Sequence, residues 1–530
     1  MTPVELEYRP LRAPQNHAAA LVQPAAAAAI KTLASLPAAS DRPSVEIGGV
    51  SLSDLAQQAR RNLIESAARY TFAYREPFEL PSATSPIVMG GHQPGLFHPG
   101  VWFKNFLLNS VSRAAGAIAV NLIVDADAIA SPTISIPERQ ADGVWRQHRA
   151  AYDAASSPIA WEERTVIDRA VFDQFGERTA DRISPIVGNP IIASLWPRVL
   201  QAVDATGNIG RSFAQARHQL EAAWGLQTLE IPLSLAYSSR SFLRFAAHLW
   251  QNASRFAAIY NDAIDEYRQL HKIRSANHPA PHLASEADLV ETPLWVWTAS
   301  DPRRRGLYVG RTSAGVRLTD RGSFDVTISN DVDSAIDALL ELEEEVRLRP
   351  RALLTTTYAR LALSDLFIHG IGGAKYDQVT DLIIARFFGV APPPIVAATA
   401  TVHLPIDRTP SATNETARIA RLLRDLRFNP DRHLGDLRSE PITELIAKKR
   451  RWLAETSPHL QAERHRAIEW VNLALQPALV EQRESLERQL TKSKREARND
   501  AIAFSREYAF SLFPEKSLRS LLLDLSAAAP

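Results

Sequence analysis

The stretch between residues 88 and 105 carries side chains that could bind and stabilise an anion. A short apolar run, Pro86-Ile-Val-Met89, is followed by glycines, two histidines and then a predicted helix. Unpaired N–H groups at the start of a helix attract phosphate or carboxylate groups, and glycines let such a group approach the main chain. We assign His92, His98 and Lys104 to catalysis, as groups that stabilise a phosphate or an oxyanion. The flanking binding candidates are Gly91, Gln93, Gly95 and Asn105.

Two carboxylates, Asp125 and Asp127, follow a second apolar run, Ile118-Ala-Val-Asn-Leu-Ile-Val124. A continuous run of this kind is typical of a strand that is buried on both faces of a parallel sheet. Ligands of open α/β sheets bind at the carboxyl ends of the strands, so this pair could bind Mg²⁺, an amine or a ribose. The alternative is a helix N-cap beside a solvated turn residue.

A third segment, Leu366 to Asp377, repeats the order of strand, glycine turn and helix. Leu366-Phe-Ile-His369 is predicted as a strand, and the charge of Lys375 at the start of the next helix could meet an anion. One glycine-rich turn is weak evidence for a site, but two such turns after parallel strands could line one crevice. The substrate- or nucleotide-binding candidates of this segment are His369, Gly370, Gly372, Gly373, Lys375 and Tyr376.

The composition excludes several classes of function. A net charge of +1 provides no global attraction to nucleic acid or to a membrane surface, and no segment approaches a transmembrane span. The chain has no cysteine, which excludes disulfides, thiolate zinc sites and cysteine nucleophiles. No residue is assigned as a metal ligand, and the expected partners are small-molecule substrates. The alanine-rich N-terminus lacks the features of a signal peptide, so the cytoplasm is the expected location.

The elements that position these side chains alternate between strand and helix. A strand near 86–89, a helix near 101–114 and a strand at 118–124 form a βαβ unit, whose crossover is expected to be right-handed. Further strands are predicted at 229–235, 366–369 and 394–398, so the fold class is α/β with a parallel-sheet core. We divide the chain into an N-terminal arm and helix (1–80), the first part of the core (81–140), a mainly helical insertion (141–227), the rest of the core with a β-meander near 292–328 (228–405), and a helical C-terminal region (406–530).

The C-terminal region carries leucines at a coiled-coil-like spacing. Leu475, Leu479, Leu486 and Leu490 are separated by four, seven and four residues. We predict a helix over 475–508 that packs this stripe, with Phe504 and Tyr508, against another helix. A homodimer through these helices and packing within the chain are the two interpretations. Residues 481–500 hold six Lys/Arg and five Asp/Glu, which indicates a solvated surface rather than a basic binding patch.

The loop Pro94-Gly-Leu-Phe-His98-Pro-Gly100 resembles the Pro-x-Gly-x-x-His-x-Gly-His loop of class I aminoacyl-tRNA synthetases and related nucleotidyltransferases. In those enzymes the histidines stabilise charge on the α-phosphate as pyrophosphate leaves. The last histidine of that motif is Val101 in this chain. The resemblance implies a nucleotidyltransferase acting on a small substrate. A helix-capping role is the alternative for His98, and a tight turn with packing glycines is the alternative for the whole loop.

Three segments in order resemble the bacillithiol biosynthesis cysteine-adding enzyme family. Gly91 to Lys104 is similar to its Thr-Gly-Gln-Gln-x-Gly-Leu-x-x-Gly-Pro-x-Tyr-x-x-x-Lys segment, although His92 replaces a Gln. Leu122 to Asp127 falls where the family has an apolar strand that ends in an acidic cluster. The stretch from Arg349 to Leu354, followed by Ile368 to Tyr376, resembles its later Ser-Pro-x-x-Leu-Leu-Arg and Val-Gly-Gly-Pro-Gly-Glu-Ile-Ala-Tyr segments.

This resemblance implies a Rossmann-like core with helical insertions, a coiled-coil dimer, and ligation of cysteine to the amine of a glucosaminyl malate. The leading hypothesis is therefore a carbon–nitrogen ligase that joins an amino acid or other small carboxylate to an amino-sugar-like amine. ATP with Mg²⁺ is the candidate source of activation. The alternatives are a nucleotidyltransferase and a non-catalytic dimeric scaffold that retains the fold.

Overall fold

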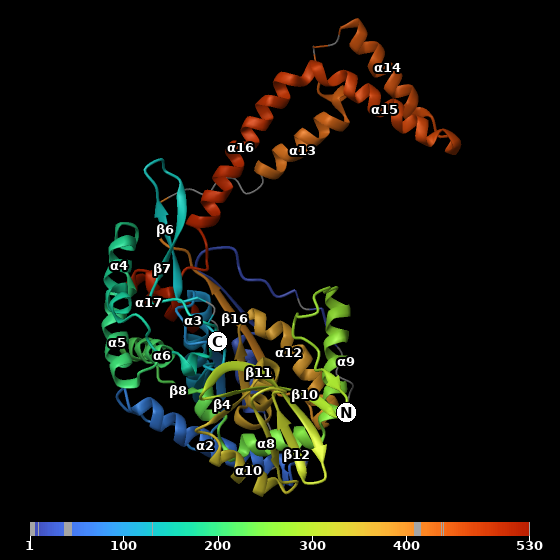
Figure 1. The fold of residues 1–530 in the computed structure, drawn as a ribbon. Helices are drawn as coiled ribbons and strands as arrows, with labels where there is room; N and C mark the ends of the chain where they lie inside the picture. The colour runs from blue at the N-terminus through green and yellow to red at the C-terminus, as the bar shows by residue number, and fades with distance from the viewer. Residues whose placement is uncertain are drawn as a thin grey trace. The chain divides into compact units, whose positions relative to one another are not determined.

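The fold is described from a computed structural model of the chain (Figure 1). The structure describes residues 6–8, 10–35, 45–129, 131–407, 415–435, 437 and 439–528. These residues form two compact units, one comprising residues 1–136, 148–404 and 506–530 and the other residues 137–147 and 405–505. Within the described part of the chain, no helix combines the length and apolarity that crossing a bilayer requires.

The centre of the first unit is a mainly parallel six-stranded sheet. Its strand order is β1-β16-β15-β4-β5-β8, and all neighbours are parallel except β1, which pairs antiparallel with β16. The predicted parallel-sheet core is confirmed. The strands are β1 (Ala19–Gln23), β4 (Ile87–His92), β5 (Ile118–Ile123), β8 (Leu229–Pro232), β15 (Leu366–His369) and β16 (Ile395–Thr401).

The connections of the sheet run in two directions from its middle. After β4 the chain moves outward through β5 to β8, and after β15 it moves the other way to β16. Numbered in chain order, the five parallel strands therefore lie in the order 3-2-1-4-5, with a switch of direction between β4 and β15. Carboxyl ends of strands at such a switch point leave a crevice.

Both predicted glycine turns are wrong in their position. Gly90 and Gly91 lie inside β4, where they pair with Asn121 and Leu122 of β5. The strand therefore continues to His92, and the loop begins at Gln93. A Cβ on Gly91 would lie 3.2 Å from the Leu122 carbonyl oxygen, so glycine permits close strand pairing here. The glycines at 370–373 form the cap and first turn of a helix rather than a separate turn.

Helices cover both faces of the sheet. Figure 1 shows α3 and α12 on either side of β16, as expected for right-handed crossovers that run in opposite directions. Helix α2 contacts β8, and its N-cap Ser51 accepts the Asp54 N–H. The helices around the parallel sheet are α1 (Ala26–Ala34), α2 (Leu52–Phe72), α3 (Pro99–Ala115), α12 (Ile371–Ile383) and α17 (Glu515–Ala527).

Between β5 and β8 lies the segment predicted as a helical insertion. A β-hairpin comes first, followed by three helices that pack on one another. The elements are β6 (Thr133–Arg139), β7 (Trp145–Ala151), α4 (Arg169–Val187), α5 (Ile191–Thr206) and α6 (Ile209–Ala223). Helix α6 carries a row of buried polar side chains, which the sequence analysis did not single out.

A second, antiparallel sheet follows β8 and three helices. It has the order β13-β12-β11-β10-β14, with β9 paired to β10, and it matches the predicted meander. The strands are β9 (Ser285–Glu286), β10 (Leu289–Thr298), β11 (Asp301–Thr312), β12 (Gly315–Thr319), β13 (Asp325–Ile328) and β14 (Val346–Pro350). The helices around it are α7 (Leu233–Ala236), α8 (Arg240–Gln251), α9 (Ala253–His271), α10 (Val332–Glu341) and α11 (Ala352–Tyr358).

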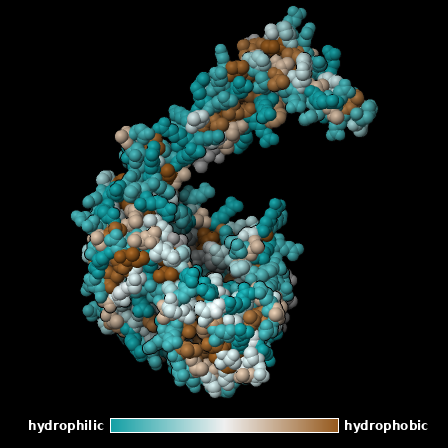
Figure 2. Space-filling model, viewed as in Figure 1, coloured by the Kyte–Doolittle hydropathy of each residue, from teal (hydrophilic) through white to brown (hydrophobic). Residues whose placement is uncertain are grey.

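The second unit is mainly helical. Its helices are α13 (Glu415–Phe428), α14 (Glu440–Ala454), α15 (Gln461–Leu475) and α16 (Val480–Ala503). Leu475 and Leu479 are buried against α13 and α14 of the same chain, with Leu486 partly buried beside them. This is the intrachain interpretation of the leucine stripe, and the homodimer remains a prediction. Trp470 and Leu473 are exposed, and Figure 2 shows hydrophobic patches along these helices.

The predicted helix over 475–508 is interrupted and shorter than expected. Pro477 lies in a 3₁₀ segment between α15 and α16, since proline cannot donate the main-chain hydrogen bond of a helix interior. Helix α16 ends at Ala503. Residues 506–530 belong to the first unit, where α17 packs on α3, so the C-terminal region predicted over 406–530 is divided between the two units.

Candidate active site

A cavity lies at the carboxyl ends of β4, β5 and β15, at the switch point of the parallel sheet. Its volume is about 270 Å³, close to the lower end of the range of roughly 300–1,000 Å³ typical of ligand pockets. The walls are largely apolar, with Leu122, Val124, Leu353 and Phe367 among them. The polar lining residues are His92, Gln93, Asp127, Thr355, Thr356, His369, Tyr376 and Asp377, with Gly91 and Gly373 between them.

His369 and Asp377 form a hydrogen-bonded pair in the wall of this cavity. His369 ends β15, Asp377 lies two turns along α12, and the His369 Nε2 is 3.1 Å from the Asp377 Oδ2. Although burial opposes ionisation, Arg360 holds the pKa of Asp377 below its ordinary value. An ionised carboxylate only accepts hydrogen bonds, so the proton of a neutral His369 ring lies on Nε2. The Nδ1 atom then carries the lone pair.

The surroundings fix the orientation of the Asp377 carboxylate. Arg360 donates to Oδ2 at 2.7 Å, and the Thr356 hydroxyl donates to Oδ1 at 2.8 Å. Arg360 is itself buried, and it also donates to Asp381 at 2.6 Å. The pair therefore has the arrangement of a general base whose carboxylate orients the imidazole and stabilises its protonated form.

Gly373 allows the His369 ring to pack against the main chain of α12. A Cβ at position 373 would lie 2.6 Å from the His369 Nδ1, closer than real Cβ atoms approach other atoms. The imidazole therefore rests directly on the main chain of the first turn of α12, and Nδ1 lies beside the part of that turn that lines the cavity. Glycine at 373 is a requirement of ring packing rather than of an unusual main-chain angle.

His92, at the end of β4, differs from His369 in its partners. Its Nε2 lies 3.0 Å from the Asn105 Oδ1, and its Nδ1 lies 2.9 Å from the Gln93 carbonyl oxygen. Burial first, and then the charges of Arg217 and Lys104, hold the pKa of His92 well below its ordinary value. Both ring nitrogens face oxygen acceptors, so the ring directs no free N–H toward a bound phosphate or oxyanion.

The two predicted carboxylates, Asp125 and Asp127, have different surroundings. Asp127 lines the cavity, accepts from the Gln93 side chain at 2.8 Å, and pairs with Arg304 at 3.3 Å. Asp125 is buried outside the cavity lining, where it accepts the N–H and the hydroxyl of Ser234 at 2.9 and 2.5 Å. Burial raises the pKa of Asp125. Asp125 is therefore neither a cavity residue nor the predicted N-cap: it lies in the turn after β5 and accepts from Ser234 in the first turn of α7, whose N-cap is Pro232.

His98 and Lys104 are also outside the cavity lining. His98 is the N-cap of α3, where its Nδ1 accepts the Gly100 N–H at 3.1 Å and its Nε2 lies 3.4 Å from Glu507. Burial lowers the pKa of His98 to about 4. Lys104 donates to the Gly91 carbonyl oxygen at 2.8 Å, and burial lowers its pKa to about 8. Both side chains support the end of β4 and the start of α3.

The remaining predicted residues have mixed positions. Gly91, Gln93, Gly373 and Tyr376 line the cavity together with His92, Asp127 and His369. The residues outside its lining are Gly95, which faces Trp161, the buried Asn105 behind His92, and Gly370, Gly372 and Lys375 at the start of α12. Asp377, Thr356 and Arg360 were not among the predicted site residues. An acidic residue eight positions after His369 was the only available signal for this group.

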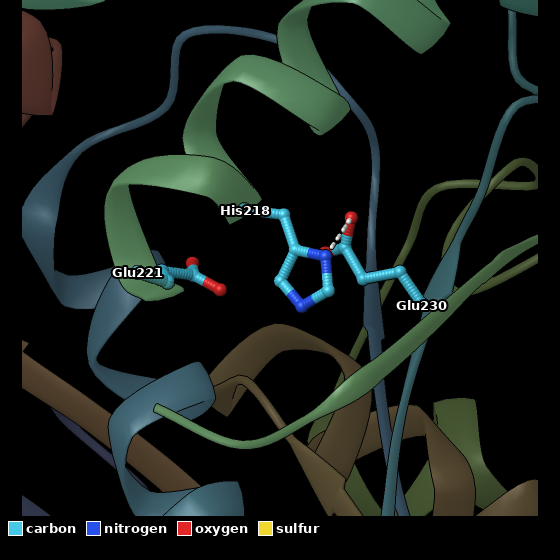
Figure 3. A group of neighbouring side chains, drawn as sticks. All are labelled: His218, Glu221 and Glu230. Carbon is cyan, nitrogen blue, oxygen red and sulfur yellow. Dashed lines mark ion pairs between the residues drawn. The ribbon is translucent and has the colours of Figure 1, made fainter. Parts of the chain in front are cut away.

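A second cluster of titratable side chains lies in the interior. His218, Glu221 and Glu230 bring one ligand atom each within 4.8 Å of one another, and Figure 3 shows the imidazole between the two carboxylates. Arg217 is buried with them and pairs with both carboxylates, at 2.6 Å in the case of Glu221. The guanidinium already supplies the positive charge that these carboxylates require. We therefore interpret the cluster as an internal ion network and assign no metal ion to it.

Searches of protein-family models and of curated proteins returned no match for this chain. The resemblance to the bacillithiol biosynthesis family therefore depends on the quoted segments alone.

Proposed function

We propose that the cavity at the switch point is the active site of an enzyme that acts on small molecules, with His369 as its general base. The hydrogen-bonded pair of His369 and Asp377, opening on that cavity, is the observation that carries the proposal. A buried carboxylate behind an imidazole stabilises the charge that forms when the ring takes up a proton. The strand order 3-2-1-4-5 supports a Rossmann-like core, the fold class in which this position binds ligands.

The proposed reaction is carbon–nitrogen ligation between a small activated carboxylate and an amine. The amine nitrogen attacks the acyl carbon, a C–N bond forms, and the bond from that carbon to its leaving group breaks. The His369 Nδ1 takes the proton that the nitrogen loses. Asp127, whose side chain is 43% exposed at the cavity, is the group that would meet the amine. The order of segments shared with the bacillithiol biosynthesis family supports this choice of reaction.

Ligation of a free carboxylate requires a source of free energy, and in this proposal ATP with Mg²⁺ supplies it. N–H groups in the first turn of a helix have no partner within the helix, so they can meet a phosphate group. Of the residues at the start of α12, Gly373 lines the cavity and would do so there, while Gly372 and Lys375 lie beside the lining and would meet only a part of the nucleotide that extends beyond it. His98, as the N-cap of α3, has no role in this proposal.

The test begins with a thermal-shift screen of nucleotides, amino acids and amino sugars, since a ligand that binds the native state raises Tm. Nucleotide consumption is then followed with the ligands that stabilise the protein. His369→Gln should lower kcat by about 10²–10⁴-fold while the ligand-induced shift in Tm remains. His282→Gln is the matched control, because His282 contacts Asp265 at 2.8 Å on the surface. Equal turnover by both variants would refute the proposal.

A further inference from the structure

A chain of buried hydrogen bonds runs from His92 into the interior. The Asn105 Nδ2 donates to the Glu221 Oε1 at 2.8 Å, and the Asn105 Oδ1 faces the His92 Nε2 at 3.0 Å. Glu221 also accepts from Arg217 and from the Trp102 indole, both at 2.6 Å. All these side chains are at least nine-tenths buried. The helices α3 and α6 supply every member of the chain except His92.

The direction of each hydrogen bond in this chain follows from its donors and acceptors. The Glu221 Oε1 that faces Asn105 already accepts from the Arg217 guanidinium and the Trp102 indole, which can only donate, so this oxygen is an acceptor. The amide nitrogen of Asn105 must therefore face Glu221, which turns its oxygen toward His92. An oxygen acceptor at this position requires a proton on the His92 Nε2. A neutral His92 ring consequently has its lone pair on Nδ1.

That lone pair has an unfavourable neighbour. The Nδ1 atom lies 2.9 Å from the Gln93 carbonyl oxygen, which is also an acceptor. The groups facing the ring are Lys104 of α3, Arg217 of α6 and the Phe97 ring, while Glu221 acts through Asn105. The two positive charges and burial keep the ring neutral. The lone pair on Nδ1 of the neutral ring therefore faces an acceptor instead of a hydrogen-bond donor. This side chain lines the cavity.

We propose that the His92 Nδ1 accepts a hydrogen bond from an N–H or O–H group of the substrate, and that Asn105 and Glu221 are positioning residues that hold the proton on Nε2. The donor replaces the unfavourable contact with the Gln93 carbonyl oxygen. At the end of β4 the cavity thus selects an amine or hydroxyl group and disfavours an anion. This inference rests on the proposed function only in placing the substrate in this cavity.

The tautomer of His92 can be measured without knowledge of the substrate. We would label the full chain with ¹⁵N-histidine, record correlations of the imidazole nitrogens, and assign His92 by the loss of its signals in His92→Gln. Wild-type protein near neutral pH should show a neutral ring with its proton on Nε2. A proton on Nδ1, or a doubly protonated ring, would overturn the inference with no variant needed.

Two matched variants separate positioning from stability. Asn105→Ala removes the acceptor for Nε2, so the proton should move to Nδ1, where the Gln93 carbonyl is the remaining acceptor. Asn121→Ala is the control, because Asn121 donates at 2.6 Å to the buried Glu230 and lies opposite Gly90 rather than His92 in the sheet. Both variants should lower Tm, but only Asn105→Ala should change the tautomer. The same tautomer in both variants would contradict the positioning role.

In the turnover assay, Asn105→Ala should raise KM by roughly three- to tenfold, as for the loss of one hydrogen bond, with a smaller effect on kcat. Asn121→Ala should leave KM unchanged. If His369→Gln abolishes turnover and Asn105→Ala has the wild-type KM, this inference fails and the proposed function stands. If neither variant affects turnover, the proposed function fails, and the tautomer measurement still decides the role of Asn105.

Discussion

Two histidines of the same cavity have opposite kinds of partner. His369 is hydrogen-bonded to a carboxylate, and its other nitrogen lies beside Gly373 at the cavity. His92 is hydrogen-bonded to a neutral amide, and burial and the charges of Arg217 and Lys104 oppose its protonation. A carboxylate partner orients the imidazole and can offset the charge that forms on it during a reaction, whereas a neutral amide partner only holds a tautomer. The partner, rather than proximity to the cavity, decides which imidazole can act as a base.

The largest effect is expected for Asp377→Asn, which would make the partner of His369 resemble that of His92. Turnover should fall by about 10²–10⁴-fold, because the charged partner of the imidazolium is lost. Stability should fall by roughly 3–5 kcal/mol, because Arg360 loses a buried counter-ion. Steady-state kinetics and urea unfolding measure the two effects, with Asp265→Asn beside His282 as the surface control. Near-normal kcat would show that the carboxylate does not assist His369.

Gly373→Ala should give the next largest effect. The new Cβ would displace the His369 ring, and a displacement of about 1 Å can cost on the order of 10²-fold in rate. Gly370→Ala is the matched control, since a Cβ there meets no atom within 4 Å. Turnover and Tm should be compared for the two variants. Equal rates would mean that the position of the His369 ring is not critical.

The smallest effect concerns the charge of Lys104 beside His92. Burial lowers the pKa of Lys104 from 10.5 to about 8, so between these values the unfolded chain holds a proton that the native protein has released. Stability therefore rises with pH across this window, by up to roughly 3 kcal/mol for this group. Lys104→Met should lack that rise, which urea unfolding at about pH 7 and about pH 10 measures. Parallel pH dependence in both proteins would contradict the burial of a titrating lysine.

Much of the fold and part of the site could be predicted from the sequence. Continuous apolar runs mark β4, β5 and β15, and the carboxyl-end rule then places His92, Asp127 and His369 at one edge. Asp377 was missed, because only the packing of α12 against β15 brings it to His369. Glu221 was missed for a similar reason, since it lies in the helical insertion more than one hundred positions from Asn105. Side-chain pairs that form only through tertiary packing are not specified by the residue types and spacing alone.

Misassigned residues also have a physical explanation. His98 is the N-cap of a helix and Asp125 lies in the turn after a strand, and at both positions a structural side chain and a catalytic one have the same sequence context. Lys104 lies on the first turns of α3, but the side chain returns to the carbonyl of Gly91 rather than facing the cavity. Sequence alone predicts that these residues follow strands, and it does not predict the direction in which their side chains point.

Carbethoxylation of histidine by diethyl pyrocarbonate, mapped by mass spectrometry, tests the central claim most directly. The reagent attacks an unprotonated imidazole nitrogen that it can reach, so no substrate is required. We predict that His369 is modified at Nδ1, faster than His92, whose Nδ1 is covered by the Gln93 carbonyl oxygen at 2.9 Å before a substrate binds, and that ligands from the thermal-shift screen protect it. Modification of His92 at an equal or higher rate, or an inert His369, would contradict the assignment of His369 as the base of this site.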